Sequence, residues 1–290
     1  MRHRDSGLRR LAILSIFAGG FSLLAACGGD GNNPAPVTGS QTFNFTGLLD
    51  TFTVPAGVST ITIDARGAQG GSVSVVCVHT GGLGARMQGT FPVTAGAVIS
   101  VLVGRQGFSN NADAGGGGGS FVVAAGNTPL IIAGGGGGAT NNIGNCGGGN
   151  LNGIGASITT SGTASGDGLV AGGINGNGGG ASSGNGGGGG GLLTNGVAGS
   201  GGATSNNGKS YLNGGLGGLG ADADDGGFGG GGAGWQTGGN GGGGGGYSGG
   251  GTSGTQPYTG GGGGGSFNSG TNPVNTAGFN TGNGSVIISW

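Results

Sequence analysis

The stretch TFTVPAGVSTITIDARGAQGG, residues 51–71, decides the fold class of this chain. Residues 60–65 alternate strictly between polar and apolar side chains, which is the pattern of a strand with one buried face. A shorter strand is expected at 51–54, and Pro-Ala-Gly at 55–57 is a turn sequence. The stretch therefore predicts two β-strands joined by a tight turn.

The same unit occurs a second time in the chain. The pattern T-F-x-V-x-A-G at 51–57 returns at 90–96, and an alternating apolar run follows each copy, the second at 98–103. We expect two hairpins that belong to two sheets or to the two halves of one sandwich. Further strands are expected at 120–125, 130–133 and 285–290.

Glycine dominates the segment between these strands. The chain has 91 glycines in 290 residues, and long runs stand at 134–138, 186–191, 241–246 and 260–265. Collagen is excluded because there is no strict three-residue period and there are only 7 prolines. The segment shows neither a helical period nor strand alternation.

Such a segment folds only if its backbone is almost completely hydrogen-bonded. Fixing one residue costs roughly 1–2 kcal/mol of backbone entropy, while a hydrogen bond contributes a net 0.5–1.5 kcal/mol or so. Glycine segments in a polyproline-II-like geometry have no internal hydrogen bonds and are free to bond to several neighbours. A flexible linker is the alternative. The strands on both sides of the segment favour an ordered arrangement.

An ordered series of motifs resembles the glycine-rich domain of the anaplastic lymphoma kinase and leukocyte tyrosine kinase receptors and its bacterial relatives. The motifs that carry the resemblance are T-F-x-V-P-A-G-V-x-x-I-x-I-x-A-x-G-A-x-G-G at 51–71 and the segments 81–85, 115–121, 260–267 and 282–290. The resemblance implies a mainly β fold, a jelly-roll-like β-sandwich with an inserted bundle of polyglycine-II helices. The single domain 41–290 would then divide into a sandwich, 41–133 and 266–290, and a glycine-rich insertion, 134–265. In the animal receptors this region serves extracellular ligand binding, and only the fold is carried over here.

The first 26 residues have the pattern of an export signal. An arginine-rich start precedes an apolar core at 11–24, which is shorter than the roughly 20 residues that a membrane-spanning helix needs. The sequence L-A-A-C that ends at Cys27 resembles the lipobox of bacterial lipoproteins, whose cysteine is acylated. An ordinary secretory signal with a chance cysteine and an uncleaved anchor are the alternatives. In Gram-negative lipoproteins an aspartate after the lipidated cysteine favours retention in the inner membrane. This chain has Gly28 there, so its resemblance to those lipoproteins favours the outer membrane. Residues 27–40 are expected to form a lipidated flexible tether.

Charge and composition argue against several classes of function. After residue 26 the chain has four cationic side chains and eight aspartates, a net charge of −4. No basic stripe exists, so nucleic acid is not an expected partner. The same part of the chain has one histidine and no glutamate, and it lacks a nucleophile elbow and an H-E-x-x-H motif. We therefore do not expect an enzyme.

Two cysteines remain after lipidation of Cys27. In an oxidising compartment Cys77 and Cys146 are expected to form a disulfide that closes a loop of roughly 70 residues, for about 4 kcal/mol of stability. Two free buried thiols are the alternative.

A short acidic segment matches the start of a calcium-binding nonapeptide repeat. G-G-L-G-A-D ends at Asp222, and Asp224 and Asp225 add two more carboxylates. However, Asp224 stands where the repeat has an apolar residue, and no tandem copies follow. A solvated acidic turn is therefore preferred to a calcium site, and no cofactor other than the lipid is expected.

Aromatic residues within the glycine-rich segment are the candidates for ligand contact. They would form a surface for a glycan or a protein, or would seal the edges of the glycine-rich bundle. These residues are Tyr211, Phe228, Trp235, Tyr247 and Tyr258. The leading hypothesis is a non-catalytic, adhesin-like binding module held on the outer membrane by its lipid, facing the cell surface or the periplasm. A structural envelope spacer without a specific ligand is the alternative.

Overall fold

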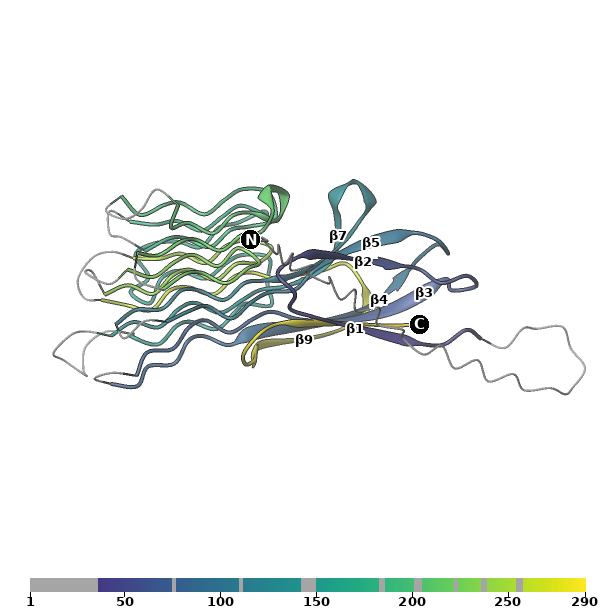
Figure 1. The fold of residues 1–290 in the computed structure, drawn as a ribbon, viewed down its shortest axis with the longest axis horizontal. Coiled ribbons are helices and arrows are strands. Elements are labelled where there is room, and N and C mark those ends of the chain that lie inside the picture. The colour runs from purple at the N-terminus through teal and green to yellow at the C-terminus, as the bar shows by residue number, and fades with distance from the viewer. Residues whose placement is uncertain are drawn as a thin grey trace, which may run out of the picture. The chain divides into compact units, whose positions relative to one another are not determined.

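The computed structural model describes nine stretches of the chain: residues 36–74, 77–109, 112–141, 150–182, 186–200, 205–221, 224–235, 239–253 and 258–290. Three expected site residues, Cys27, Cys146 and Asp222, lie outside them. The described residues belong to one compact unit, Pro36–Trp290. Within this unit, one part consists of strands and the other of extended glycine-rich segments that run side by side (Figure 1).

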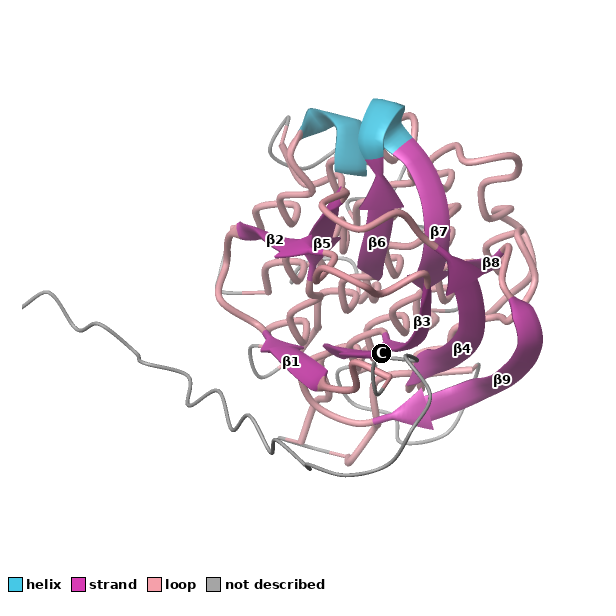
Figure 2. Cartoon of the chain, turned by 90° about the vertical axis from the view of Figure 1, so that its right-hand side faces the viewer, coloured by secondary structure: helices cyan, strands magenta, loops and turns pink. Residues whose placement is uncertain are grey.

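Two antiparallel sheets, each of five strands, make up the first part of the described chain. One sheet has the order β1 (Ser40–Asn44), β10 (Ser285–Ser289), β3 (Thr60–Arg66), β4 (Gly84–Pro92), β9 (Thr271–Asn280). The other has the order β2 (Leu49–Thr53), β5 (Val98–Leu102), β6 (Ser120–Ala124), β7 (Thr128–Ala133), β8 (Phe267–Asn268). Two 3₁₀ helices are also present, η1 (Ala125–Asn127) and η2 (Tyr211–Asn213). Figure 2 shows the two sheets as two layers, which confirms a mainly β, sandwich-like fold.

The apolar faces of the two sheets pack against each other. In β3, Ile61 and Ile63 are buried while Thr62 and Asp64 face outward, as the alternation in the sequence predicts. Burial of a side chain of this size contributes about 1.5–3 kcal/mol, so the core between the sheets is a main source of stability. Its largest fully buried members include Phe52, Ile61, Ile63, Met87, Val101, Ile131 and Ile288.

The two repeated sequence units do not form hairpins, and that prediction is wrong. Strand β2 pairs with β5 and β3 pairs with β4, so each unit starts in one sheet and ends in the other. Gly57 and Gly96 have φ values of 81° and 82°, at the third position of two equivalent turns. These are type II turns, which do not have the twist of the primed turns that close two-residue hairpins.

The six strands whose ranges the sequence predicts are all present, each within two residues of its predicted ends. Strand β4 begins six residues before the second repeated unit, and β1 and β8 were not predicted. Strand β9 was not predicted, since its sequence TNPVNTAGFN lacks apolar alternation. It lies at the edge of its sheet, where a proline is tolerated because one side of the strand needs no ladder hydrogen bonds. Its pairing with β4 is irregular, with register shifts.

The glycine-rich part packs on the outer face of the second sheet. Leu102, Phe121 and Ile132 lie side by side there, on the face opposite to the sandwich core. The rings of Tyr211 and Phe121 are stacked with their centroids 5.3 Å apart, and those of Tyr247 and Phe267 are stacked with their centroids 5.0 Å apart. This second apolar cluster joins the sandwich to the glycine-rich segments.

One glycine segment, residues 134–139, shows how the glycine-rich part is held together. From Gly135 to Thr140 the N–H groups donate in turn to three neighbouring segments, and each neighbour recurs every third residue: Gly136 and Ala139 donate to Ala68 and Gly71. The N–H of Gly134 donates to Ser266 Oγ. The other two acceptor segments are 242–245 and 151–154. Its carbonyl groups accept from three further segments, 82–85, 114–117 and 261–264. The segment therefore has six hydrogen-bonded neighbours.

Three of these neighbours, 68–71, 82–85 and 114–117, come from outside the expected insertion. Residues 67–83 and 104–119 leave the sandwich after β3 and β5 and join the same hydrogen-bonded array. The array thus includes more of the chain than the stretch 134–265 that the sequence indicated. It is covalently continuous with the sandwich at several points, and these connections align the two parts.

Close approach, rather than backbone conformation, requires glycine inside the array. A Cβ atom on Gly136 would lie far closer than 3.0 Å to the carbonyl oxygen of Gly82, and one on Gly137 would lie equally close to that of Gly261. Neither glycine has a positive φ. The neighbouring backbones occupy the space where a side chain would stand, as expected for segments packed by direct backbone hydrogen bonds.

A single buried hydroxyl ties the two sheets to the array. Ser120 is fully buried; its Oγ donates to the carbonyl oxygen of Arg66 at 2.7 Å and accepts from the N–H of Gly104 at 3.0 Å. Ser120→Ala should cost about 2 kcal/mol, because two backbone groups lose their partner. We expect a melting temperature lower by about 4–8 °C, measured by circular dichroism. Ser289→Ala, which removes a surface hydroxyl near Ser40, should change it little.

Candidate functional site

Cationic side chains are scarce among the described residues, and the four that are present gather in two places. Arg66 and Arg86 surround Asp64 on the outer face of the first sheet. Arg105 and Lys209 line a groove between the sandwich and the glycine-rich part. The two places differ in whether the cations are already paired.

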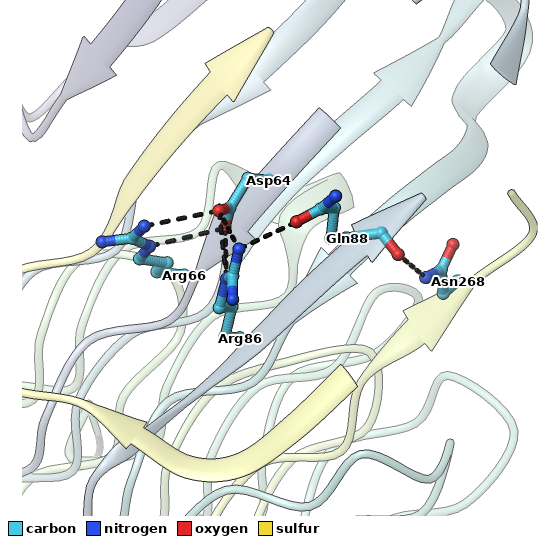
Figure 3. Close-up of polar contacts among 5 residues, drawn as sticks. All are labelled: Asp64, Arg66, Arg86, Gln88 and Asn268. Carbon is cyan, nitrogen blue, oxygen red and sulfur yellow. Dashed lines mark hydrogen bonds and ion pairs between the residues drawn. The ribbon is translucent and has the colours of Figure 1, made fainter. Parts of the chain in front are cut away.

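In the Asp64 cluster, the side chains of Asp64, Arg66, Arg86 and Gln88 are hydrogen-bonded to one another (Figure 3). Arg86 Nη2 lies 2.8 Å from Asp64 Oδ2 and also donates to Gln88 Oε1 at 2.8 Å. Burial acts to raise the pKa of Asp64, but the hydrogen bonds from Arg86 and Arg66 outweigh it and lower the pKa. The ring of Phe279 lies within 6 Å of both guanidinium groups. Because both guanidinium groups are paired with Asp64 and lie against Phe279, we interpret the cluster as structural.

The second place, which we call the Arg105 groove, has a volume of about 280 Å³. Phe45 follows β1, Arg105 and Phe108 follow β5, and Lys209 and Phe228 come from the glycine-rich part. The Arg105 backbone is fixed, since its N–H donates to Phe228 and its carbonyl accepts from Gly118. Two exposed leucines, Leu216 and Leu219, also line the groove.

Aromatic rings hold the Arg105 side chain. Its guanidinium carbon lies 3.4 Å from the ring centroid of Phe108 and 5.8 Å from that of Phe45. Among the described residues, this side chain donates no hydrogen bond and forms no ion pair. Burial lowers the pKa of Arg105, while the charge of Asp225 acts in the opposite direction. Despite this shift a guanidinium group remains protonated in proteins, so Arg105 is charged and holds N–H donors that the described chain does not use.

The other charged groups of the groove are only partly engaged. Lys209 Nζ donates to Asn207 Oδ1 at 2.8 Å, and Asp225 Oδ1 accepts from the N–H of Gly220 at 2.7 Å. Two cations against one carboxylate give the groove a positive balance in a chain whose net charge is negative. Apolar and aromatic walls with a few polar groups are typical of ligand sites, and this charge balance selects an anionic ligand.

The five predicted aromatic contacts do not form one surface. Tyr211, Phe228 and Tyr247 pack against the apolar cluster on the second sheet, and Phe228 also lines the Arg105 groove. Trp235 and Tyr258 lie at the opposite end of the run 241–246, beside Asn240 and Gly239. Only Phe228 thus combines a predicted contact role with a place in the groove.

The acidic residues proposed for calcium have separate surroundings. Asp225 lines the Arg105 groove, while Asp224 is buried and its charge acts on Asp113. Asp113 is fully buried and accepts a hydrogen bond from Thr140 at 2.5 Å. Burial, with a smaller contribution from the charge of Asp224, raises the pKa of Asp113 to about 8 against the lowering effect of the hydrogen bond from Thr140. Within the described ranges, no three His, Cys, Asp or Glu side chains gather in a metal-binding arrangement.

Cys77 is disulfide-bonded. It lies between Val73 and His79, which pair in a short antiparallel bridge at the start of the glycine-rich array. Cys146, the partner expected from the sequence, lies outside the described residues, so this pairing stays a prediction.

Sequence reasoning missed Arg105, Lys209, Phe45 and Phe108. They come from distant segments, and none of them belongs to a local motif. The sequence did offer one indication, the scarcity of cationic residues. Only four Lys or Arg residues follow residue 26, and two of them line this groove.

No protein-family model matches the chain, and no curated protein matches it in sequence. Over the part of the chain that the structure describes, no helix has both the length and the apolar character to cross a membrane. The case for function therefore rests on the geometry above.

Proposed function

We propose that this protein is a non-catalytic binding module of the bacterial envelope, anchored to the outer membrane through a lipid on Cys27. Its ligand carries an anionic group that Arg105 and Lys209 hold. The observation that carries the proposal is the Arg105 groove, where a guanidinium held between two rings has N–H donors that no described residue uses. An acidic saccharide fits best, since charged groups and aromatic or aliphatic walls suit its carboxylate and its C–H faces.

The proposed scaffold is a jelly-roll-like sandwich with a bundle of polyglycine-II helices. The three-residue recurrence of hydrogen bonds and the six neighbours of segment 134–139 support this geometry, which has three residues per turn and no internal hydrogen bonds. Such a bundle is stiff because every segment bonds to its neighbours. Stiffness keeps the Arg105 groove preformed, which reduces the entropy lost on binding.

The location of the domain is tested by protease treatment of intact cells, with a periplasmic protein as the control for leakage. Digestion in intact cells would support surface display. If the domain is protected in intact cells and cleaved after lysis, the adhesin-like hypothesis is wrong and a periplasmic role is indicated. Mass spectrometry of the purified protein tests the lipid on Cys27.

Ligand binding is tested with oligomers of a uronic acid and neutral oligomers of equal length, by titration calorimetry. We expect the wild-type protein to prefer the acidic oligomer and to lose affinity as salt rises. Arg105→Gln should weaken binding about tenfold or more, because a hydrogen bond to a charged group contributes about 1.5–3 kcal/mol. Asp225→Asn should strengthen binding, since it removes the carboxylate from the groove.

A matched control separates the groove from general electrostatics. Arg66→Gln changes the net charge as Arg105→Gln does, but on the outer face of the first sheet. Equal losses in both variants, or equal affinity for acidic and neutral oligomers, would contradict the proposal. Failure of the folded wild-type protein to bind any acidic probe would favour the alternative, a structural spacer.

A further inference from the structure

A second, larger groove of about 500 Å³ lies away from the Arg105 groove, on the sandwich. Its walls come from the start of β5, the end of β4, and the η1 and β7 region. The residues that matter here are Pro92, Val93, Val98, Ile99, Ala125 and Leu130. No charged side chain is among its lining residues. We call it the end groove.

The loops around the end groove also lack charge. The turn 94–97 lies beside the turn 55–58, since the N–H of Val54 donates to the carbonyl oxygen of Ala97 and the N–H of Gly96 donates to that of Val54. Residues 36–39, 55–59, 92–98 and 124–130 contain no Asp, Glu, Lys, Arg or His. Val98 is 54% exposed and Val37 is 48% exposed. Most water-facing surfaces carry charged side chains, so an uncharged, partly apolar end is suited to another environment.

The described chain begins at this same end. Val37 Cγ2 lies 3.5 Å from the position of a Cβ on Gly57, in the first of the two turns. Eight residues lie between Cys27 and Pro36, and the nine residue steps span at most about 30 Å. A lipid on Cys27 would therefore keep the uncharged end close to the membrane. Figure 2 looks onto this end of the sandwich.

We infer that the uncharged end rests on the phospholipid bilayer, with lipid acyl chains entering the end groove. The Arg105 groove and the glycine-rich array then extend toward the solution. The inference rests on the proposed lipid anchor, because the anchor supplies the proximity. The contact itself is a property of residues 92–98 and 124–130.

Trp290 reports on the contact. It pairs with Gly39 through two backbone hydrogen bonds and packs on Phe52, so it lies at the uncharged end. We would place the lipidated protein in phosphatidylcholine vesicles with brominated acyl chains, using Trp235→Phe to remove the other tryptophan. An interfacial contact buries apolar groups about 5–10 Å into the headgroup and acyl boundary. We expect about a twofold loss of Trp290 emission compared with vesicles of unbrominated lipid.

Two matched variants test the surface. Val98→Asp should abolish most of the quenching, while Val197→Asp, at a valine with a similar exposure of 51% in the glycine-rich part, should leave it unchanged. Circular dichroism must show that both variants are folded. If Val98→Asp does not fold, Val37→Asp at the same end takes its place. Quenching that persists in the folded variant at this end, or is absent in the wild-type protein on vesicles, would overturn the inference.

Flotation of the vesicles separates this failure from failure of the anchor. A protein that floats without quenching is anchored but makes no contact through this end. If mass spectrometry finds no lipid on Cys27, the mature chain is held on the vesicles by an N-terminal histidine tag and a nickel-chelating lipid. Quenching in that arrangement would support the contact even though the proposed anchor had failed.

Discussion

Gly136→Ala should prevent stable folding of this protein, although alanine adds only one methyl group. The added Cβ would meet the oxygen, the carbonyl carbon and the Cα atom of Gly82, all of them backbone atoms closer than 3.0 Å. Gly82 donates to Gly137 and accepts from Gly70, so its displacement breaks hydrogen bonds in two directions. We expect a loss of more than about 4 kcal/mol, beyond the usual cost of overpacking, because no side chain is available to move aside.

Gly155→Ala is the matched control for this prediction. Gly155 belongs to the same glycine-rich part and has no positive φ, but the nearest atom to an added Cβ is Gly278 Cα at 3.3 Å. This variant should remain folded, with a melting temperature within a few degrees of the wild type, because alanine also reduces the entropy of the unfolded chain. Thermal unfolding by circular dichroism and the soluble yield compare the two variants. Similar stability of both would contradict the close-packed arrangement around segment 134–139.

The sandwich was largely predictable because its signals are local. Alternation at 60–65 depends on the two faces of one strand, and Gly57 and Gly96 stand in equivalent turns with positive φ. The pairing of those units was not predictable from the same signals. A turn sequence shows that the chain reverses, but it does not show whether the next strand stays in the sheet or crosses to the other one.

The sequence predicted that the glycine-rich part is held by backbone hydrogen bonds, but not which segments are neighbours. Its need for backbone hydrogen bonds follows from entropy, but glycines carry no side chains whose pattern would identify the neighbours of a given segment. Residues 68–71 and 114–117 border segment 134–139 although nothing in their sequence pairs them with it. The Arg105 groove was missed for a related reason, since Phe45, Arg105 and Lys209 meet only after these segments have packed.

The buried carboxyl of Asp113 should make the protein less stable as pH rises from 5 to 8. Its pKa is about 8 in the folded protein and near 3.8 in the unfolded chain, so between these values the folded state holds a proton that the unfolded state has released. Stability from this group is greatest below about pH 4 and falls as pH increases toward 8. Three pH units correspond to a loss of up to about 4 kcal/mol in the free energy of unfolding.

Urea unfolding at several pH values measures this loss, and two substitutions identify its source. Asp113→Asn keeps the acceptor for Thr140 and removes the charge, so it should abolish the decrease between pH 5 and pH 8. Thr140→Val removes the hydrogen bond that lowers the pKa of Asp113, so the decrease should continue above pH 8. Asp64 and Asp167 have lowered pKa values, and their linked changes fall below about pH 4, outside this window. A wild-type free energy of unfolding that stays constant or rises from pH 5 to pH 8, with the same profile in Asp113→Asn, would show that the carboxyl is not held protonated. In that case a charged Asp113 would lie beside Asp224 within the array. This pair of buried carboxylates would then need a compensating cation.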